Sequence, residues 1–165
     1  MVILADLLSH TGLRLRPVVD LRRSDAVRWV ATSEIANPAP FLEGGEVLLT
    51  TGLETAEWQH QWDKYVARLV KAGVVAIGLG LGFTHASAPG ALVVACRHHG
   101  LDLFEVPRET RFVSISHFIA DELQREAHAA TRDELVSQRA LTQAALEDEP
   151  EVALVAAVAR ATEMA

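Results

Sequence analysis

The stretch VVAIGLGLG, residues 74–82, is a continuous apolar run that is too short to cross a membrane. Such a run is typical of a parallel β-strand that is covered on both faces. Before it, apolar residues recur every three or four positions from Thr55 to Gly73, which predicts an amphipathic helix. After it, Pro89 begins and Gly100 ends a second predicted helix. The stretch therefore lies between two helices, as a strand of an α/β protein does.

The rest of the chain extends this alternation in both directions. Strands are predicted at 16–20, 27–35, 46–51, 74–82 and 101–107, with a short opening helix at 2–9 and a proline-containing loop at 37–41. Alternating strands and helices indicate a parallel sheet with right-handed crossovers. The expected fold class is α/β, with a mostly parallel sheet and flanking helices, followed by a long C-terminal helix.

The long helix is predicted from the absence of glycine and proline between Phe112 and about Glu147. Apolar residues keep helical spacing as far as Ala127, and the pattern then becomes polar and rich in alanine. We expect its later part to leave the domain. The expected organisation is an α/β domain over 1–111, a linker or dimerisation helix over 112–147, and the start of a truncated middle domain over 148–165.

Composition narrows the function classes. The chain has 165 residues, half of them hydrophobic, which is enough for one domain with its own core. Its net charge of -7 argues against a chain that mainly grips phosphate backbones. Cys96 is the single cysteine, so an intrachain disulfide and a multi-cysteine zinc site are excluded, and a small core residue is expected. The opening residues reach Asp6 and His10 too soon for a signal peptide, so a cytoplasmic protein is expected.

The familiar catalytic and cofactor motifs are not matched. GLGLGF, residues 78–83, has Phe83 where the dinucleotide-binding fingerprint needs glycine, which favours a strand-end turn. Of the seven histidines, His98 and His99 are adjacent on a helix and are expected to point apart, and no HExxH occurs. The serines lack the GxSxG context, although sequence order leaves open a Ser/His/Asp set assembled in space. We expect no metal, no cofactor and no catalytic residues.

The ends of the predicted parallel strands are more informative. Ligands of open α/β sheets bind beyond the carboxyl ends of the strands. Hydroxyls, carboxylates and glycines gather there: Ser33, Glu34, Thr50, Thr51, Gly78, Gly80 and Glu105. They suit a small polar ligand. The alternative is that these groups only cap helices and satisfy loop amides.

Two threonines end the strand of EGGEVLLTTG, residues 43–52. Because side chains alternate along a strand, Thr50 and Thr51 are expected to face opposite sides of the sheet. One should face the crevice near Glu34 and the other should satisfy backbone amides of the loop, while Gly52 lets the backbone turn.

Three segments, residues 27–53, 65–82 and 100–115, resemble the N-terminal domain of the purine catabolism regulator (PucR-like) family of bacterial transcription factors. The motifs of that family fall on the following residues: Ser33, Glu34 and Pro38; Gly44, Gly45, Glu46, Leu49, Thr50, Thr51 and Gly52; and Leu103, Glu105, Val106 and Pro107. The resemblance implies a sensory domain that is followed by a middle domain and a DNA-binding helix-turn-helix. The sequence given contains no candidate for that helix-turn-helix after residue 130.

The resemblance implies a non-catalytic, effector-sensing domain of a regulator of purine or other nitrogen- or carbon-source catabolism. The expected partners are a small-molecule effector such as a purine-pathway metabolite, a second copy of the chain, and DNA only through the helix-turn-helix. No membrane is expected as a partner. The expected ligand-binding residues are Ser33, Glu34, Glu46, Thr50, Thr51, Gly52, Gly78, Gly80 and Glu105. Two alternatives stay open, a dimerisation module of the same regulator and a small-metabolite enzyme.

Overall fold

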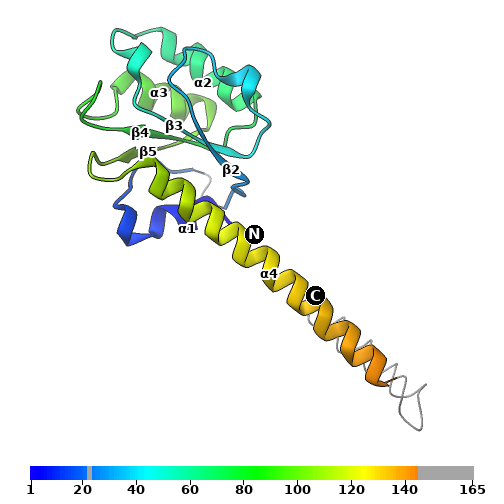
Figure 1. Ribbon diagram of the computed structural model, residues 1–165. Coiled ribbons are helices and arrows are strands. Elements are labelled where there is room, and N and C mark those ends of the chain that lie inside the picture. The colour runs from blue at the N-terminus through cyan, green and yellow to red at the C-terminus, as the bar shows by residue number, and fades with distance from the viewer. Residues whose placement is uncertain (22–23, 145–165) are drawn as a thin grey trace. The chain divides into compact units, whose positions relative to one another are not determined.

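One sheet of five strands organises the part of the chain that the structure, a computed structural model, describes, which is residues 1–21 and 24–144 (Figure 1). The strands are β1 (Arg16–Val19), β2 (Trp29–Thr32), β3 (Glu46–Thr50), β4 (Ala76–Gly80) and β5 (Asp102–Val106), in the spatial order β1-β5-β4-β3-β2. β2, β3, β4 and β5 pair in parallel, whereas β1 pairs antiparallel with β5. The α/β class is confirmed, but the sheet is mixed, because hydrophobic patterning does not encode the direction of an edge strand.

Within residues 1–21 and 24–144, four α-helices accompany the sheet: α1 (Leu4–Ser9), α2 (Gln61–Lys71), α3 (Gly90–His99) and α4 (Phe112–Ala144). Short 3-10 turns lie at Thr11–Leu13, Ala39–Phe41 and Leu53–Thr55. The second helix begins later than the period from Thr55 suggests. Trp58 precedes it, and its ring still packs edge-on against Trp62 and Tyr65, at centroid distances of 5.1 and 5.3 Å.

The helices cover the two faces of the sheet, with α2 and α3 on one face and α1 with the first turns of α4 on the other (Figure 1). Under α2 and α3 the core includes the buried Trp62, Leu69, Ile77 and Leu79. Cys96 belongs to this core, and burial raises the pKa of its thiol to about 12, which fits the expected structural role.

The opposite face has a core of its own. It contains Leu4 and Leu7 from α1, Leu49 and Phe104 from the sheet, and Ile115 and Ile119 from α4. Phe112, Phe118 and Leu123 pack against it. The apolar stripe at the start of α4 is therefore part of the domain's own core.

The chain divides into two compact units, Met1–Leu123 and Gln124–Ala165. The described part of the second unit is the later portion of α4. The expected middle-domain start at 148–165 lies outside the described residues. Among the helices of the described residues, none combines the length and the apolar character that crossing a membrane requires.

Candidate functional site

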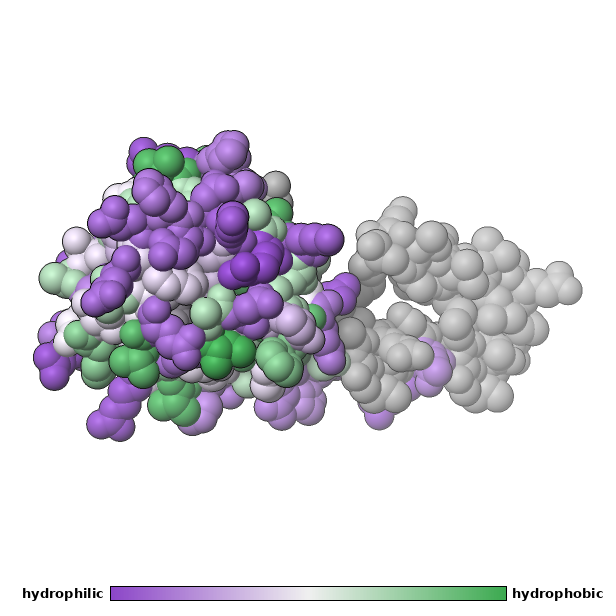
Figure 2. Space-filling model, turned by 90° about the horizontal axis from the view of Figure 1, so that it is seen from above, coloured by the Kyte–Doolittle hydropathy of each residue, from purple (hydrophilic) through white to green (hydrophobic). Residues whose placement is uncertain are grey.

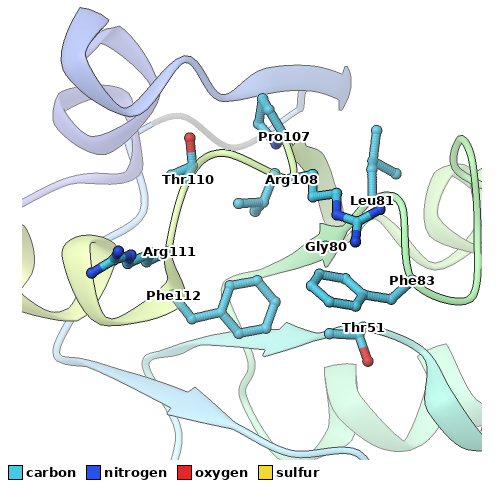
Figure 3. A pocket seen from close by; sticks show the side chains of 10 residues that line it. Thr51, Gly80, Leu81, Phe83, Pro107, Arg108, Thr110, Arg111 and Phe112 are labelled. Carbon is cyan, nitrogen blue, oxygen red and sulfur yellow. The ribbon is translucent and has the colours of Figure 1, made fainter.

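A hollow of about 180 Å³ lies at the carboxyl edge of the parallel strands (Figure 3). Its lining comes from the ends of β3, β4 and β5, the loop after β4 and the start of α4: Thr51, Gly80, Leu81, Phe83, Val106, Pro107, Arg108, Thr110, Arg111 and Phe112. The segments that follow the three strands meet here because parallel strands end at the same edge.

Backbone hydrogen bonds hold the loops that form this hollow. The Leu81 amide donates to the Val106 carbonyl at 2.9 Å, which fixes the chain just after β4 against the end of β5. The Thr110 amide donates to the Pro107 carbonyl at 2.9 Å and closes the turn before α4. The Thr110 hydroxyl donates to the Leu13 carbonyl at 2.8 Å. These bonds position the turn before α4.

Glycine at position 80 makes room for an aromatic wall. A Cβ added to Gly80 would lie 2.8 Å from Cζ of Phe112 and 3.5 Å from Cγ2 of Thr51. The ring of Phe112 therefore rests directly on the backbone of β4. In Figure 3 the rings of Phe83 and Phe112 lie near each other beside Thr51.

Arg108 supplies positive charge beside the aromatic rings. Its Cζ lies 5.5 Å from the centroid of the Phe83 ring, within the range of a cation–π contact. Its side chain also runs along Gly82, where an added Cβ would come within 3.0 Å of Cδ. Arg111 extends to the other side of Phe112 (Figure 3). Since α4 begins at Phe112, the positive end of its helix dipole adds to the same electrostatic preference for negative charge.

A hydrogen-bonded turn lies at the end of β3, where we define the Glu34 turn as Glu34 with residues 50–55. The carboxylate of Glu34 accepts three hydrogen bonds, from the Thr50 hydroxyl at 3.1 Å, the Thr51 amide at 2.7 Å and the Leu53 amide at 3.1 Å. The Thr50 oxygen in turn accepts from the Gly52 amide at 3.0 Å. The strand ends on a buried hydroxyl because that hydroxyl links Glu34 to the turn.

Gly52 and His85 complete the Glu34 turn. Gly52 has a φ of 71°, a left-handed conformation that favours glycine. The Thr55 hydroxyl donates to the Gly52 carbonyl at 2.7 Å and lies 3.0 Å from Nε2 of His85. Burial lowers the pKa of His85, which favours the neutral form of its ring.

The structure separates the expected ligand-binding residues into groups. Thr51 and Gly80 line the hollow, whereas Glu34, Thr50 and Gly52 form the Glu34 turn. Ser33 follows β2, and its amide donates to the Leu49 carbonyl at 3.0 Å. Glu105 on β5 accepts a hydrogen bond from the Ala88 amide at 2.8 Å and so holds the loop after β4.

Two of the expected residues do not reach this edge. Glu46 lies at the amino end of β3, where its carboxylate accepts hydrogen bonds from the Glu43 and Gly44 amides at 2.7 and 2.8 Å. Gly78 lies in the middle of β4, between Leu49 and Phe104. The family motif that contains Glu46 spans the whole of β3, and the glycine run that contains Gly78 begins inside β4.

The sequence interpretation missed Phe83, Arg108, Arg111 and Phe112, which line the hollow. Phe83 directly follows the segment GLGLG, and Arg108 directly follows EVP. Their position just after predicted strand ends is the feature of the sequence that could have identified them.

The two threonines give a matched pair of predictions. Thr50→Val removes a buried hydroxyl that joins Glu34 to the Gly52 amide, so we expect it to lower the free energy of unfolding by about 1–2 kcal/mol. The side chain of Thr51 lines the hollow, and Thr51 contacts Glu34 only through its backbone amide, which the substitution keeps. Thr51→Val should therefore change the free energy of unfolding by less than about 0.5 kcal/mol. Urea unfolding of both variants measures this. Equal stabilities would mean that the Thr50 hydroxyl does not support the turn.

The sheet and the hollow together define a small α/β domain of the kind in which ligand sites lie beyond the carboxyl ends of parallel strands. The model of the purine catabolism regulatory protein-like (PucR) family matches residues 6–123, and the chain belongs to this family. This match confirms the family resemblance seen in the motifs. It ends at Leu123, which is also the last residue of the first compact unit. Searches of the curated proteins and of the solved structures gave no significant match.

Proposed function

We propose that this domain is the effector-sensing, non-catalytic part of a cytoplasmic bacterial transcription regulator of purine or other nitrogen- or carbon-source catabolism. Membership of a regulator family supports the regulatory role. The effector binds in the hollow beside Phe83, Arg108 and Phe112. In this proposal DNA is contacted through a separate helix-turn-helix of the regulator.

The observation that carries the proposal is that Phe112 belongs both to the hollow and to the packing of α4 against the core. Its side chain lines the hollow, packs against the core under α1 and α4, and belongs to the first residue of α4. A ligand that presses on this ring changes the packing at the point where α4 leaves the sheet edge. Ile115 and Ile119 follow on the same core-facing side of the helix and are buried. Effector binding in this account biases the position of α4, which leads to the rest of the regulator.

The lining indicates what kind of effector would bind. Two aromatic rings favour a flat ligand through stacking, and the guanidinium of Arg108 favours hydrogen-bond acceptors or negative charge. The volume of about 180 Å³ is below the usual range of about 300–1,000 Å³ for drug-sized ligands. A small, acceptor-rich heterocycle or carboxylate therefore suits the site better than a dinucleotide does.

The Glu34 turn supports a non-catalytic role. Glu34 lies at the end of β3, where its carboxylate already accepts three hydrogen bonds from the protein. A carboxylate whose oxygens already accept hydrogen bonds from the turn is a poor candidate for a general base. This arrangement does not favour the enzyme alternative.

The early apolar stripe of α4 does not favour the dimerisation alternative. Ile115 and Ile119 of that stripe are buried in the domain's own core, and Leu123 packs against it. A homodimer remains a prediction, and sedimentation of the 165-residue chain measures it directly.

A thermal-shift panel of purine bases, nucleosides and small carboxylates tests the effector proposal. A ligand at a hundred times its dissociation constant should stabilise the domain by about 2.7 kcal/mol. Arg108→Gln should weaken binding of that ligand at least tenfold, because a charge-assisted hydrogen bond is lost. Arg97 is an exposed residue of α3, so Arg97→Gln is the matched control and should bind like the parent. A ligand that binds the parent and Arg108→Gln equally well would contradict the assignment of the hollow.

A further inference from the structure

Three side chains with metal-binding atoms meet on the helical layer of the domain. Asp63 lies in α2, and His98 and His99 lie in the last turn of α3. Nε2 of His99 lies 2.9 Å from Oδ1 of Asp63, and Nδ1 of His98 lies 3.3 Å from the same oxygen. The three donor atoms all lie within 4.8 Å of one another.

The expectation that His98 and His99 point apart is wrong. Their ring centroids are 4.5 Å apart, and both rings reach one carboxylate oxygen. Adjacent residues on a helix differ in direction by about 100°. His98 presents its near nitrogen, Nδ1, and His99 its far nitrogen, Nε2, so the two imidazoles can converge despite that difference.

We propose that Asp63, His98 and His99 form a binding site for a divalent late transition metal, with Zn²⁺ as the foremost candidate. Two imidazole nitrogens and a carboxylate oxygen are ligands that suit zinc, whereas calcium and magnesium prefer sites made of oxygen alone. Zinc lies about 2.0–2.2 Å from such ligands, so two donors of a tetrahedral site are separated by about 3.3 Å. The separations of 2.9 and 3.3 Å from Oδ1 to the two nitrogens are close to this value.

The surroundings of the cluster leave room for a metal and for water. The side chain of Asp63 is 57% exposed and that of His98 is 70% exposed, while that of His99 is 22% exposed. A hollow of about 300 Å³ borders the cluster on the side of Asp63, and neither His98 nor His99 lines it. Hydrophilic residues cover much of the surface seen from above in Figure 2, with hydrophobic ones scattered among them. Water can therefore complete the coordination, as it does where a protein supplies three ligands.

In the structure as it stands, Oδ1 of Asp63 is within hydrogen-bonding distance of both imidazole rings. The metal would replace the hydrogen-bonding protons between the carboxylate and the rings and would join α2 to α3. This site is separate from the effector hollow and does not depend on the proposed function.

Zinc binding to the tag-free 165-residue chain at pH 7.5, measured by competition with a chromophoric chelator, tests the proposal. The parent should bind one Zn²⁺ per chain. His98→Ala, His99→Ala and Asp63→Asn should each weaken binding at least tenfold, and the double histidine variant more. His117→Ala removes an exposed histidine on α4 and serves as the matched control with parent-like affinity. Far-UV circular dichroism checks that each variant is folded.

Two further readouts distinguish a metal site from a hydrogen-bonded cluster. Zn²⁺ should raise the melting temperature of the parent and leave that of the double histidine variant unchanged. Co²⁺ should give visible absorption bands with the parent that disappear in the double variant. The proposal is overturned if the parent does not bind zinc stoichiometrically, or if the double variant binds it as tightly as the parent does.

Discussion

Gly78→Ala is expected to lower the free energy of unfolding by about 3 kcal/mol, because a methyl group has no space in the middle of β4. An added Cβ would lie 2.5 Å from Cδ2 of Leu49 and 2.7 Å from two ring carbons of Phe104. Both neighbours are buried, at 0% and 1% exposure, so they cannot swing into solvent to relieve the overlap. Urea or thermal unfolding followed by circular dichroism measures the loss.

Gly90→Ala is the matched control for this substitution. Gly90 is the first residue of α3, and nothing lies within 4 Å of the Cβ that alanine would add. Alanine favours helix over glycine by up to about 1 kcal/mol, so this variant should be as stable as the parent or slightly more stable. If Gly78→Ala unfolded at the same denaturant concentration as Gly90→Ala, the close packing of Leu49 and Phe104 over β4 would be wrong.

Glu34→Ala is expected to cost about 2–3 kcal/mol of stability. The substitution removes the acceptor for the Thr50 hydroxyl and for the Thr51 and Leu53 amides, and hydrogen bonds to a charged group contribute about 1.5–3 kcal/mol each. Glu34 is partly exposed, so water replaces some of what is lost, which keeps the total well below the sum of three bonds. Chemical unfolding at neutral pH provides the measurement.

Glu57→Ala controls for the loss of a surface carboxylate. Glu57 is exposed on the segment before α2, and its removal should change stability by less than about 0.5 kcal/mol. A loss at Glu34 no larger than the loss at Glu57 would show that the carboxylate does not hold the turn after β3.

The parts of the fold that the sequence revealed are those with strong local signals. The continuous apolar run of β4, the helical spacing of Trp62, Val66 and Leu69 in α2, and the stops at Gly73 and Gly100 all identify their elements correctly. The direction of β1 had no such signal, since a four-residue edge strand can pair with β5 in either direction. Its antiparallel pairing is decided by the tertiary structure.

The candidate site was harder to predict than the fold. Thr51 and Gly80 line the hollow, and their position at strand ends could be predicted from the sequence. Phe83 and Arg108 come from loops whose meeting depends on the arrangement of β4 and β5. Glu46 begins its strand, as the sequence predicts, and the family motif that contains it does not say which of its residues contact a ligand. The meeting of His98 and His99 depends on which ring nitrogen each presents, and residue spacing does not contain this information.

The most direct test of the effector proposal is an amide ¹H–¹⁵N NMR titration of the 165-residue chain with the most stabilising compound of the thermal-shift panel. We predict that the largest shift changes fall on Thr51, Gly80, Phe83, Arg108 and Phe112, and that they continue into the first turns of α4 as far as Ile119. If the compound binds while these amides stay unchanged and the largest changes fall elsewhere, the hollow is not the effector site and the account is contradicted.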